Sequence, residues 1–492
     1  MKYSSTRDFS KEYSASEAIA RGLAPDGGLF VPRELPHITP LELAALAEKN
    51  YPMRAAYVMS LFLDEFSIEE LEDYCCKAYS RSRFDGEPAP VVKRGEDLYL
   101  ELWHGPTCAF KDMALQMLPR LLPASMKKSG QREKALILTA TSGDTGKAAL
   151  EGFCDVEDTE IVVFYPENGV SDVQKLQMTT QHGSNVHVQA VRGNFDDAQN
   201  GVKRILNDPE VAAAVEARGR RFTSANSINW GRLLPQIAYY LSAYLDCVRL
   251  GEIKFDDELN FCVPTGNFGN ILAAYYAKCI GVPIGRLICA SNANNVLTDF
   301  IRTGKYDRNR AFHTTISPSM DILISSNLER LLCHLSGDPV KVKDFMDDLS
   351  RKGEYLVGGE LKSQIGELFW ADFCDDADTK QTIARVWKES NYLLDPHTAV
   401  ATAVKQKYFT STDDSRKTVI VSTANPYKFC SAVISAIEGG SASGGVELID
   451  RLSELTGTTP PPQLASLKDA QVRFKGSCSP EDMSQIVLNF LK

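Results

Sequence analysis

Residues 104–112 have the sequence HGPTCAFKD, and this stretch lies where a predicted strand gives way to a helix. An apolar strand is expected just before it, at Tyr99–Trp103, and a helical pattern of apolar residues begins at Met113. The Gly-Pro pair inside the stretch ends the strand. Lys111 is therefore expected near a helix N-terminus, at the carboxyl end of a strand.

Two features of this position favour a neutral amine on Lys111. The helix dipole disfavours a positive charge there, and the apolar neighbour Phe110 removes hydration, so both lower the pKa of the lysine. A neutral lysine amine can form a Schiff base and transfer protons. The alternative is an ordinary surface lysine at the start of a helix, with Asp112 as an ion-pair partner that keeps it charged.

The composition of the whole chain is that of a soluble globular protein with two or three domains. The chain has 492 residues, of which 43% are hydrophobic and 24% are charged. The net charge of −10 argues against a general binder of nucleic acid or membrane surfaces, although a local group of amides and cations can still bind a small anion.

The sequence predicts a cytoplasmic protein without a metal site. Its N-terminus lacks the apolar core of a signal peptide, and no apolar run reaches the roughly 18 residues of a membrane span. The 12 cysteines and 7 histidines are dispersed, and no C-x-x-C pair is present.

Three regions of the chain differ in their predicted secondary structure. Residues 1–92 are expected to form a helical N-terminal domain, because capping boxes mark helix starts at Ser14, Thr39 and Ser67. From residue 93 to 430, strands alternate with helices, which is typical of an α/β fold with mostly parallel sheet flanked by helices. The expected strands are Tyr99–Trp103, Ala135–Ala140, Glu160–Tyr165, Asn185–Ala190, Leu259–Pro264, Arg286–Ala290 and Thr418–Ser422. A glycine- and serine-rich linker at 439–445 joins this core to a C-terminal extension, 431–492, which is expected to pack on the core.

Two glycine-containing loops follow predicted strands, at the sheet edge where α/β proteins bind ligands. The first, TSGDTG at 141–146, presents free N–H groups at a helix start, although its spacing is not that of a nucleotide-binding P-loop. The second, TGNFGN at 265–270, has two glycines that bracket two residues, so its backbone can cup a phosphate. Either loop could also be an ordinary turn.

Two further polar segments are candidates for ligand contacts. The segment TSANSINWGR ends at Arg232, in the first turn of a predicted helix, where a cation is better explained if an anion binds at the same helix start. The alternative is an N-capping loop with its arginine in water. The strand Thr418–Ser422 runs into Thr423, whose hydroxyl could bond a cofactor ring nitrogen or simply cap the strand.

Together these features suit one kind of cofactor. An aldehyde cofactor that carries a phosphate needs an amine for a Schiff base, a cup for the phosphate and a partner for its ring nitrogen, and pyridoxal 5'-phosphate has these properties. A nicotinamide enzyme would be expected to carry G-x-G-x-x-G after a strand, and the chain lacks that pattern.

These motifs resemble those of the threonine synthase family. The resemblance is carried by GLAPDGGLFVP at 22–32, HGPTCAFKD at 104–112, TATSGDTG at 139–146, SANSIN at 224–229 and PTGNFG at 264–269. It extends from about residue 14 to 430. It implies the fold-type II architecture of pyridoxal-phosphate enzymes, with a small mobile subdomain at about 134–225 that closes over the site.

The resemblance also implies residue roles toward the cofactor. Lys111 would hold pyridoxal phosphate as a Schiff base and then act as general base and acid. Thr423 would face the ring nitrogen, and Asp144 would lie near the ring hydroxyl, where related synthases that act on serine derivatives usually have asparagine. The cradle of the cofactor phosphate would comprise Gly266, Asn267, Phe268, Gly269 and Asn270.

The implied reaction converts O-phospho-L-homoserine and water to L-threonine and phosphate, the last step of threonine biosynthesis, by γ-elimination and β-addition of water. Ser142 and Thr145 would contact the substrate carboxylate, whereas Ser227, Asn229 and Arg232 are candidates for the substrate phosphate. The expected partner is this small molecule alone, with no nucleic acid, membrane or metal, and the protein would be a monomer or homodimer.

Two alternatives remain open at this point. A phospho-lyase that releases 2-oxobutyrate would use the same cofactor and lysine. A non-catalytic protein could bind a phosphorylated metabolite through the same loops.

Overall fold

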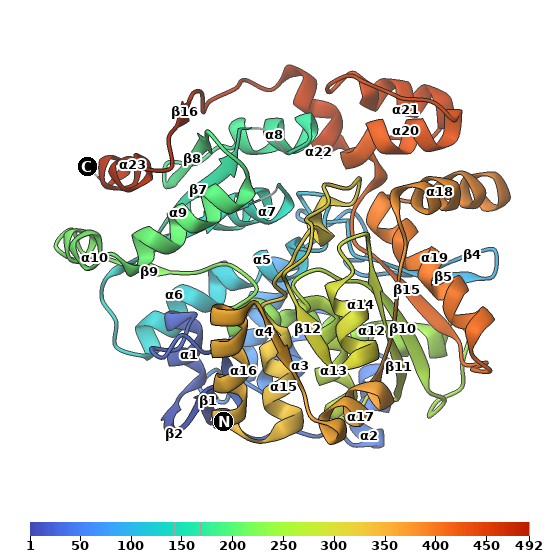
Figure 1. Ribbon diagram of the computed structural model, residues 1–492, viewed down its shortest axis with the longest axis horizontal. Helices are drawn as coiled ribbons and strands as arrows, with labels where there is room; N and C mark the ends of the chain where they lie inside the picture. Colours follow the sequence, from blue (N-terminus) through green and yellow to red (C-terminus); the bar gives the residue numbers. More distant parts are fainter. Residues whose placement is uncertain (142, 168–169, 492) are drawn as a thin grey trace.

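The larger of two parallel sheets forms the centre of the molecule and has the strand order β14-β11-β10-β15-β5-β4 (Figure 1). The computed structural model describes residues 1–141, 143–167 and 170–491. Neighbouring strands are parallel, except that β4 is antiparallel to β5. The strands are β4 (Val91–Arg94), β5 (Asp97–Glu101), β10 (Leu259–Pro264), β11 (Ile284–Ser291), β14 (Phe369–Phe373) and β15 (Thr418–Ser422).

Helices cover both faces of this sheet, so its central strands are buried throughout. Alternate residues of β10 point to opposite faces: Phe261 belongs to the large core that includes α12 and α13, whereas Cys262 packs in the core of α19. The helices that pack around the sheet are α5 (Asp112–Leu115), α6 (Leu118–Lys128), α11 (Trp230–Leu233), α12 (Pro235–Arg249), α13 (Gly269–Cys279), α18 (Asp376–Ser390) and α19 (Pro396–Ser411).

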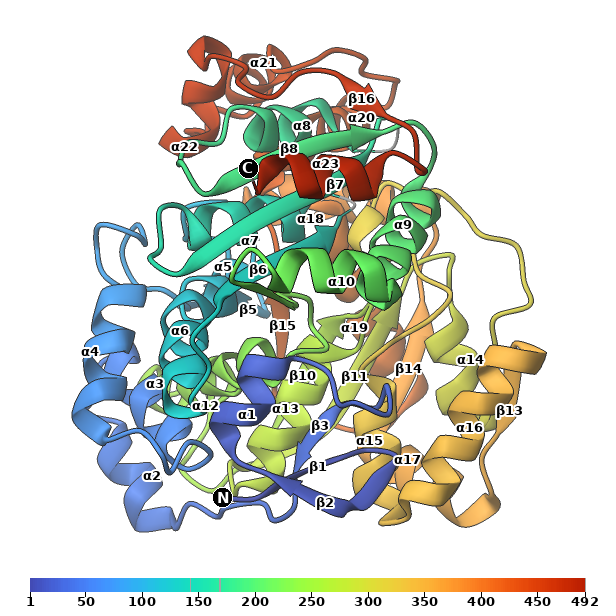
Figure 2. The same cartoon turned by 90° about the vertical axis from the view of Figure 1, so that its left-hand side faces the viewer.

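A smaller, wholly parallel sheet has the order β16-β8-β7-β6-β9 (Figure 2). Its strands are β6 (Lys134–Ala140), β7 (Thr159–Pro166), β8 (Val186–Val191), β9 (Arg220–Thr223) and β16 (Ser477–Cys478). Four of them lie within the predicted subdomain 134–225, while β16 comes from the C-terminal segment. The helices of this unit are α7 (Asp144–Phe153), α8 (Asp172–Thr179), α9 (Phe195–Asn207) and α10 (Pro209–Glu216).

The N-terminal region is helical, and the capping boxes at Ser14, Thr39 and Ser67 are confirmed. It also contains a three-stranded antiparallel sheet, and its apolar residues belong to the same core as the large sheet. The N-terminal region therefore has no separate core among the described residues. Its elements are β1 (Tyr3–Ser5), β2 (Asp8–Tyr13), α1 (Ala15–Arg21), β3 (Phe30–Pro32), α2 (Pro40–Leu46), α3 (Tyr51–Ser60) and α4 (Ile68–Ala78).

Residues 296–368 form a group of helices beside β11 and β14. Its elements are α14 (Val296–Thr303), β12 (Lys305–Asp307), η1 (Pro318–Met320), α15 (Leu328–Ser336), α16 (Pro339–Lys352), β13 (Glu354–Leu356) and α17 (Gly359–Leu368). The loop between β12 and α15 contains η1, which reaches the site described below.

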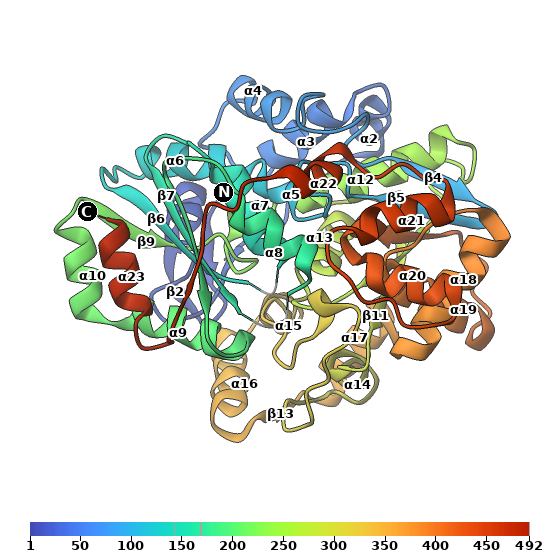
Figure 3. The same ribbon diagram turned by 90° about the horizontal axis from the view of Figure 1, so that it is seen from above.

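The C-terminal segment contacts both units (Figure 3). It begins against α18 in the main unit, then crosses to the small sheet, where β16 pairs with β8 and the last helix packs on α9 and α10. Its elements are η2 (Pro426–Phe429), α20 (Cys430–Glu438), α21 (Leu448–Thr456), α22 (Pro462–Ala465), η3 (Ser466–Asp469) and α23 (Met483–Phe490).

All seven predicted strands occur, and each of their ends lies within two residues of the predicted position. Other strands, among them β4 and β9, were not predicted, because their sequences VVKR and RRFT mix charged with apolar residues and carry little periodic signal. In the described parts of the chain, no helix is both long and apolar enough to cross a membrane.

Candidate active site

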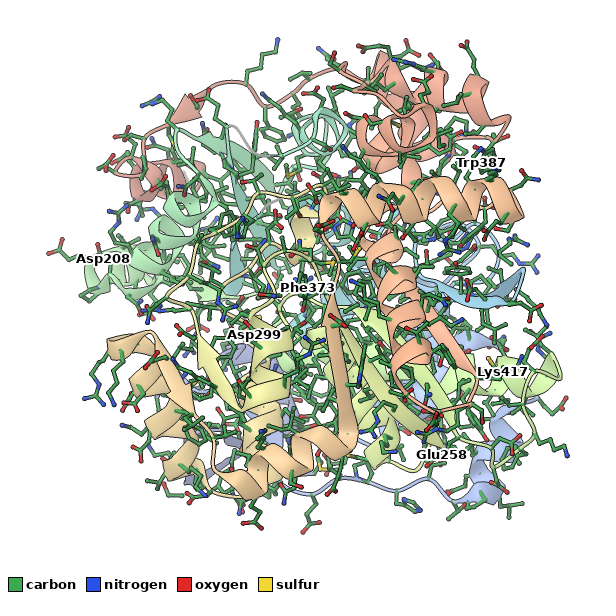
Figure 4. The ribbon with its side chains drawn as sticks, turned by 45° about the vertical axis from the view of Figure 1, so that its right-hand side comes forward. Asp208, Glu258, Asp299, Phe373, Trp387 and Lys417 are labelled. Carbon is green, nitrogen blue, oxygen red and sulfur yellow. The ribbon has the colours of Figure 1, made fainter. Side chains whose placement is uncertain are left out.

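The predicted site residues of the core gather at the carboxyl edge of the large sheet, which faces the small sheet. In Figure 4, Glu258 and Lys417 mark the amino ends of β10 and β15, and Phe373 marks the carboxyl end of β14 nearer the centre of the molecule. Lys111 follows β5 and Thr423 follows β15, and the two loops are joined by a hydrogen bond of 2.8 Å from the Phe110 amide to the Thr423 carbonyl.

Lys111 is buried, with 7% of its surface exposed, so it is not a surface lysine. Its Nζ lies 3.2 Å from Asp144 Oδ2 and 3.2 Å from Ser319 Oγ, and 4.5 Å from the centre of the Phe110 ring. Burial lowers the pKa of Lys111, and the nearby Lys428 adds to this effect, while Asp144 opposes it. The surroundings of Lys111 thus favour the neutral form of its amine more than water does.

Asp112 does not pair with Lys111, contrary to the alternative that its position in the sequence suggested. Its two carboxylate oxygens accept hydrogen bonds from the amide and the hydroxyl of Thr107, both at 2.8 Å. Burial raises the pKa of Asp112 to about 6, and the Thr107 hydrogen bonds act against that rise. A side chain at Gly105 would collide with Asp112, so the glycine is needed for this tight turn.

Asp144 is the electrostatic centre of the site. Its Oδ1 lies 2.8 Å from Lys428 Nζ and 2.9 Å from Gln174 Nε2, while its Oδ2 faces Lys111. Burial alone would raise the pKa of Asp144, but Lys428 and Lys111 outweigh it and hold that pKa well below its usual range. Asp144 comes from the small unit and both lysines come from the main unit, so this carboxylate joins the two.

Lys428 was not identified from the sequence. It lies in η2, is fully buried, and also donates to the Thr107 carbonyl at 2.8 Å. The available signal was a lysine within the segment that follows Thr423, six residues beyond the end of the buried strand β15.

The loop Gly266–Asn270 turns β10 into the N-terminus of α13. A side chain at Gly266 would place its Cβ 2.6 Å from the Ser319 carbonyl oxygen, and Phe268 adopts a left-handed φ of 62°. The Gly266 carbonyl accepts from Ser325 and the Asn267 carbonyl accepts from Asn327. These bonds fix the loop at the start of a helix of 11 residues.

Asn270 shows that this loop is suited to an anion. Its Oδ1 accepts hydrogen bonds from Tyr239 and Tyr240, which orients the amide, yet its buried Nδ2 has no partner in the described protein. A buried donor at a helix N-terminus matches what a phosphate group requires. The residues therefore fit the phosphate of the implied cofactor.

Arg232 is a second anion-binding candidate. It is buried, donates to the Ala225 carbonyl at 2.7 Å and reaches Thr145 Oγ1 at 3.4 Å, and no carboxylate pairs with it in the described parts of the chain. Burial lowers its pKa to about 10, which still leaves it charged near neutral pH. An uncompensated buried cation favours a bound anion. The structure thus brings the predicted residues Thr145 and Arg232 together.

Asn229 requires a correction. Its Nδ2 donates to the carbonyls of Ile19 and Ser224, and its Oδ1 accepts from the Gly231 amide, so the side chain is fully bonded and has no exposed surface. The predicted contact of Asn229 with the substrate phosphate is therefore replaced by a structural role, in which it holds the loop that leads to Arg232.

Three predicted site residues remain, namely Ser227, Thr423 and Ser142. Ser227 lies beside the glycine loop, because its Cβ would be 3.6 Å from a Cβ at Gly269. Thr423 follows β15 and is buried, with 4% of its surface exposed. Ser142 lies outside the described residues.

Comparison with known proteins supports the class that the fold and site define. A family model described as "Pyridoxal-phosphate dependent enzyme" matches residues 89–358. The chain thus belongs to the family of pyridoxal-phosphate-dependent enzymes and has their fold-type II architecture.

More specific matches identify the family. Models described as "Threonine synthase N terminus" and "Threonine synthase, C-terminal" match residues 2–79 and 398–484. The threonine synthase of Schizosaccharomyces pombe is 37% identical over 472 residues, which cover 90% of each chain. The chain belongs to the threonine synthase family.

Two further similarities help to place the protein within the family. The structure of PLP-bound threonine synthase from Brucella melitensis aligns over the full length of both chains, with a TM-score of 0.88 and 36% identity. Human threonine synthase-like 1 is 42% identical over 436 residues, which cover 86% of this chain but 58% of that relative. The chain thus spans less than two thirds of the length of this group of relatives.

Proposed function

We propose that this protein is a threonine synthase, which converts O-phospho-L-homoserine and water to L-threonine and phosphate. The observation that carries the proposal is the buried Lys111 amine, near which two separate anion sites open: the glycine loop with Asn270, and the uncompensated guanidinium of Arg232. A phosphorylated substrate and a phosphorylated cofactor together require two such sites.

Pyridoxal phosphate would be held by residues of four elements. Lys111 would bind it covalently, residues 266–270 would hold its phosphate at the start of α13, and Thr423 would offer its hydroxyl to the ring nitrogen. Asp144 would lie beside the ring hydroxyl. When bound, the cofactor acts as an electron sink that acidifies the hydrogens at Cα and then Cβ of the substrate.

The protein groups then perform positioning and proton transfer. Lys111 is the base and acid at these carbons, because burial lowers the pKa of its amine and so favours the neutral form that can accept a proton. Asp144 holds that amine from one side, and Lys428 holds Asp144. Arg232 would bind the substrate phosphate, with Ser227 as a further candidate, and Thr145 and Ser142 would meet the substrate carboxylate.

The proposal is tested by measuring products. Purified protein is incubated with pyridoxal phosphate and O-phospho-L-homoserine, and threonine, 2-oxobutyrate and phosphate are quantified. A synthase gives threonine equal to phosphate, and Lys111→Ala abolishes both. Release of 2-oxobutyrate in place of threonine would make the protein a phospho-lyase, because water then fails to add at Cβ.

Absence of phosphate release would contradict both enzymatic functions and leave binding of a phosphorylated metabolite. The cytoplasmic location and the monomeric or homodimeric state stay predictions.

A further inference from the structure

Ser319, in η1, touches the site from an element that the sequence did not connect with it. Its hydroxyl accepts a hydrogen bond from Lys111 Nζ at 3.2 Å. Its backbone is packed so closely on the glycine loop that only glycine fits at position 266. Ser319 thus bridges the lysine and the loop proposed to hold the cofactor phosphate.

A buried histidine holds this serine in place. The Ser319 amide donates to His397 Nε2 at 3.2 Å, and His397 Nδ1 lies 2.7 Å from Asp395 Oδ1. A backbone N–H can only donate, so Nε2 must carry the lone pair and Nδ1 must carry the proton that bonds Asp395. His397 and Asp395 are 2% and 1% exposed, which protects this arrangement from water.

The same aspartate also reaches the other side of the site. Asp395 is the N-cap of α19 and accepts from the amides of His397 and Thr398, and it bonds the Thr398 hydroxyl. The Thr398 hydroxyl accepts in turn from the Thr423 amide at 3.3 Å. One capping carboxylate therefore positions both the serine at the lysine and the threonine at the end of β15.

We propose that Ser319 is a further catalytic residue, whose hydroxyl orients the Lys111 amine for proton transfer, and that Asp395 and His397 are its positioning residues. A neutral amine has two N–H bonds and one lone pair. Asp144 Oδ2 and Ser319 Oγ provide one acceptor for each N–H bond, so the lone pair stays free to take the substrate proton. The inference rests on the proposed function and adds residues to its site.

The first test replaces the hydroxyl. Ser319→Ala is expected to lower kcat by about 3- to 10-fold, the effect of losing one hydrogen bond between neutral groups, with KM changed less than about twofold. The second readout is the pH at which the visible absorption band of the bound cofactor changes. Loss of an acceptor for N–H should move that midpoint down by about one pH unit.

This spectral midpoint also depends on the charges that face Lys111. These are Asp144 on α7, Lys428 in η2 and Arg232 on α11. None of them is altered by Ser319→Ala, so a shift reports the lost hydroxyl.

The second test separates the two bonds of the histidine. In His397→Asn, the amide can still reach Asp395 in place of Nδ1, but it cannot reach the Ser319 amide. In His397→Gln, the longer side chain places an oxygen where Nε2 accepts. We expect His397→Asn to reproduce the kinetic and spectral changes of Ser319→Ala, and His397→Gln to restore most of the activity. His313→Asn, at an exposed histidine six residues before Ser319, serves as the control and should match the wild type.

The double variant decides whether His397 acts through Ser319. If it does, Ser319→Ala with His397→Asn should be no slower than Ser319→Ala alone, whereas multiplied losses would overturn the positioning role. Wild-type kcat and an unshifted spectral midpoint in Ser319→Ala would overturn the catalytic role. The spectral midpoint is measured with bound cofactor and without substrate. If the midpoint shifts in Ser319→Ala but neither the wild type nor the variants turn over substrate, the result contradicts the proposed reaction and not the role of Ser319.

Discussion

At the scale of single residues, the site depends on charges that are buried in pairs and on one buried carboxylate that is not paired with a cation. Asp144 is shared by Lys111 and Lys428, with no solvent to compensate if one of them is lost. Asp112, next to Lys111 in sequence, is instead bonded to Thr107 and has a raised pKa. Each arrangement makes a separate prediction.

Lys428→Met should lower the free energy of unfolding by about 3 kcal/mol, because removing one partner of a buried ion pair leaves a poorly compensated charge. The matched control is Lys77→Met. Lys77 pairs with Asp73 at 2.6 Å, but their side chains are 57% and 49% exposed, so this loss should stay within about 0.5 kcal/mol. Urea denaturation measures both, and equal losses would contradict the burial of the Lys428 pair.

Asp112 should make the protein less stable as the pH rises from about 4 to 6. Its pKa is 3.8 ordinarily and about 6 in the folded protein, so the folded state binds this proton more tightly than the unfolded chain. The stability it contributes is present below pH 3.8 and is lost as the pH rises through about 6. The total is about 3 kcal/mol.

Asp112→Asn, which cannot titrate, provides the comparison for this pH dependence. The difference in unfolding free energy between wild type and variant should fall across that pH range in urea titrations. A difference that does not vary with pH would show that Asp112 keeps an ordinary pKa.

At the scale of elements, the position of Lys111 depends on how closely α7 approaches α5. Gly152 lies within α7, and a methyl group there would overlap the carbonyl oxygen of Leu115, the last residue of α5. The contact links the helix that carries Asp144 to the helix that Lys111 precedes. This close approach of two backbones requires the glycine.

Gly152→Ala should therefore destabilise the protein by about 2–3 kcal/mol, although alanine is the better helix former. Gly366→Ala is the control, because Gly366 lies inside α17 with no atom within 4 Å of the added methyl group. That change should stabilise by up to about 1 kcal/mol. Thermal or urea unfolding should show a loss of stability for Gly152→Ala and a gain for Gly366→Ala. A gain of stability in both variants would mean that α5 and α7 are farther apart.

At the scale of the whole molecule, the C-terminal segment completes the small unit. β16 adds a strand to β8, and apolar residues of α23 join the core under α9 and α10. Met483 is fully buried there, and a side chain at Gly201 would overlap its sulfur. The unit that carries Asp144 is therefore formed by two segments that are distant in sequence, residues 134–223 and residues 477–490.

Met483→Ala should cost about 2–4 kcal/mol, because it leaves a cavity between α23 and α9. Amide hydrogen exchange should become faster in β6, β7 and β8, while β10 and β11 keep their protection. The control is Leu356→Ala, at a leucine that is 67% exposed, with no expected change. Faster exchange in both sheets would indicate that the two units unfold as one.

Sequence alone determined the features that depend on local chemistry. Continuous apolar runs predicted seven strands, capping boxes predicted three helix starts, and the turn at Lys111 and the glycine loop were located from adjacent residues. Such signals are readable because strand burial, helix capping and glycine turns each involve residues a few positions apart. The α/β fold class followed from the alternation of strands and helices, whereas the family was indicated by the resemblance of the motifs.

Only the tertiary structure decided which side chains meet. Lys111 and Ser319 are separated by 208 residues of sequence, and Lys428 and Thr107 by 321. Conversely, Asp112 is adjacent to Lys111 in sequence but accepts its hydrogen bond from Thr107. Asn229 was expected to contact the substrate phosphate, but its amide donates to the backbone instead. Side-chain direction and burial depend on packing between distant segments, so neighbours in sequence do not establish partners in space.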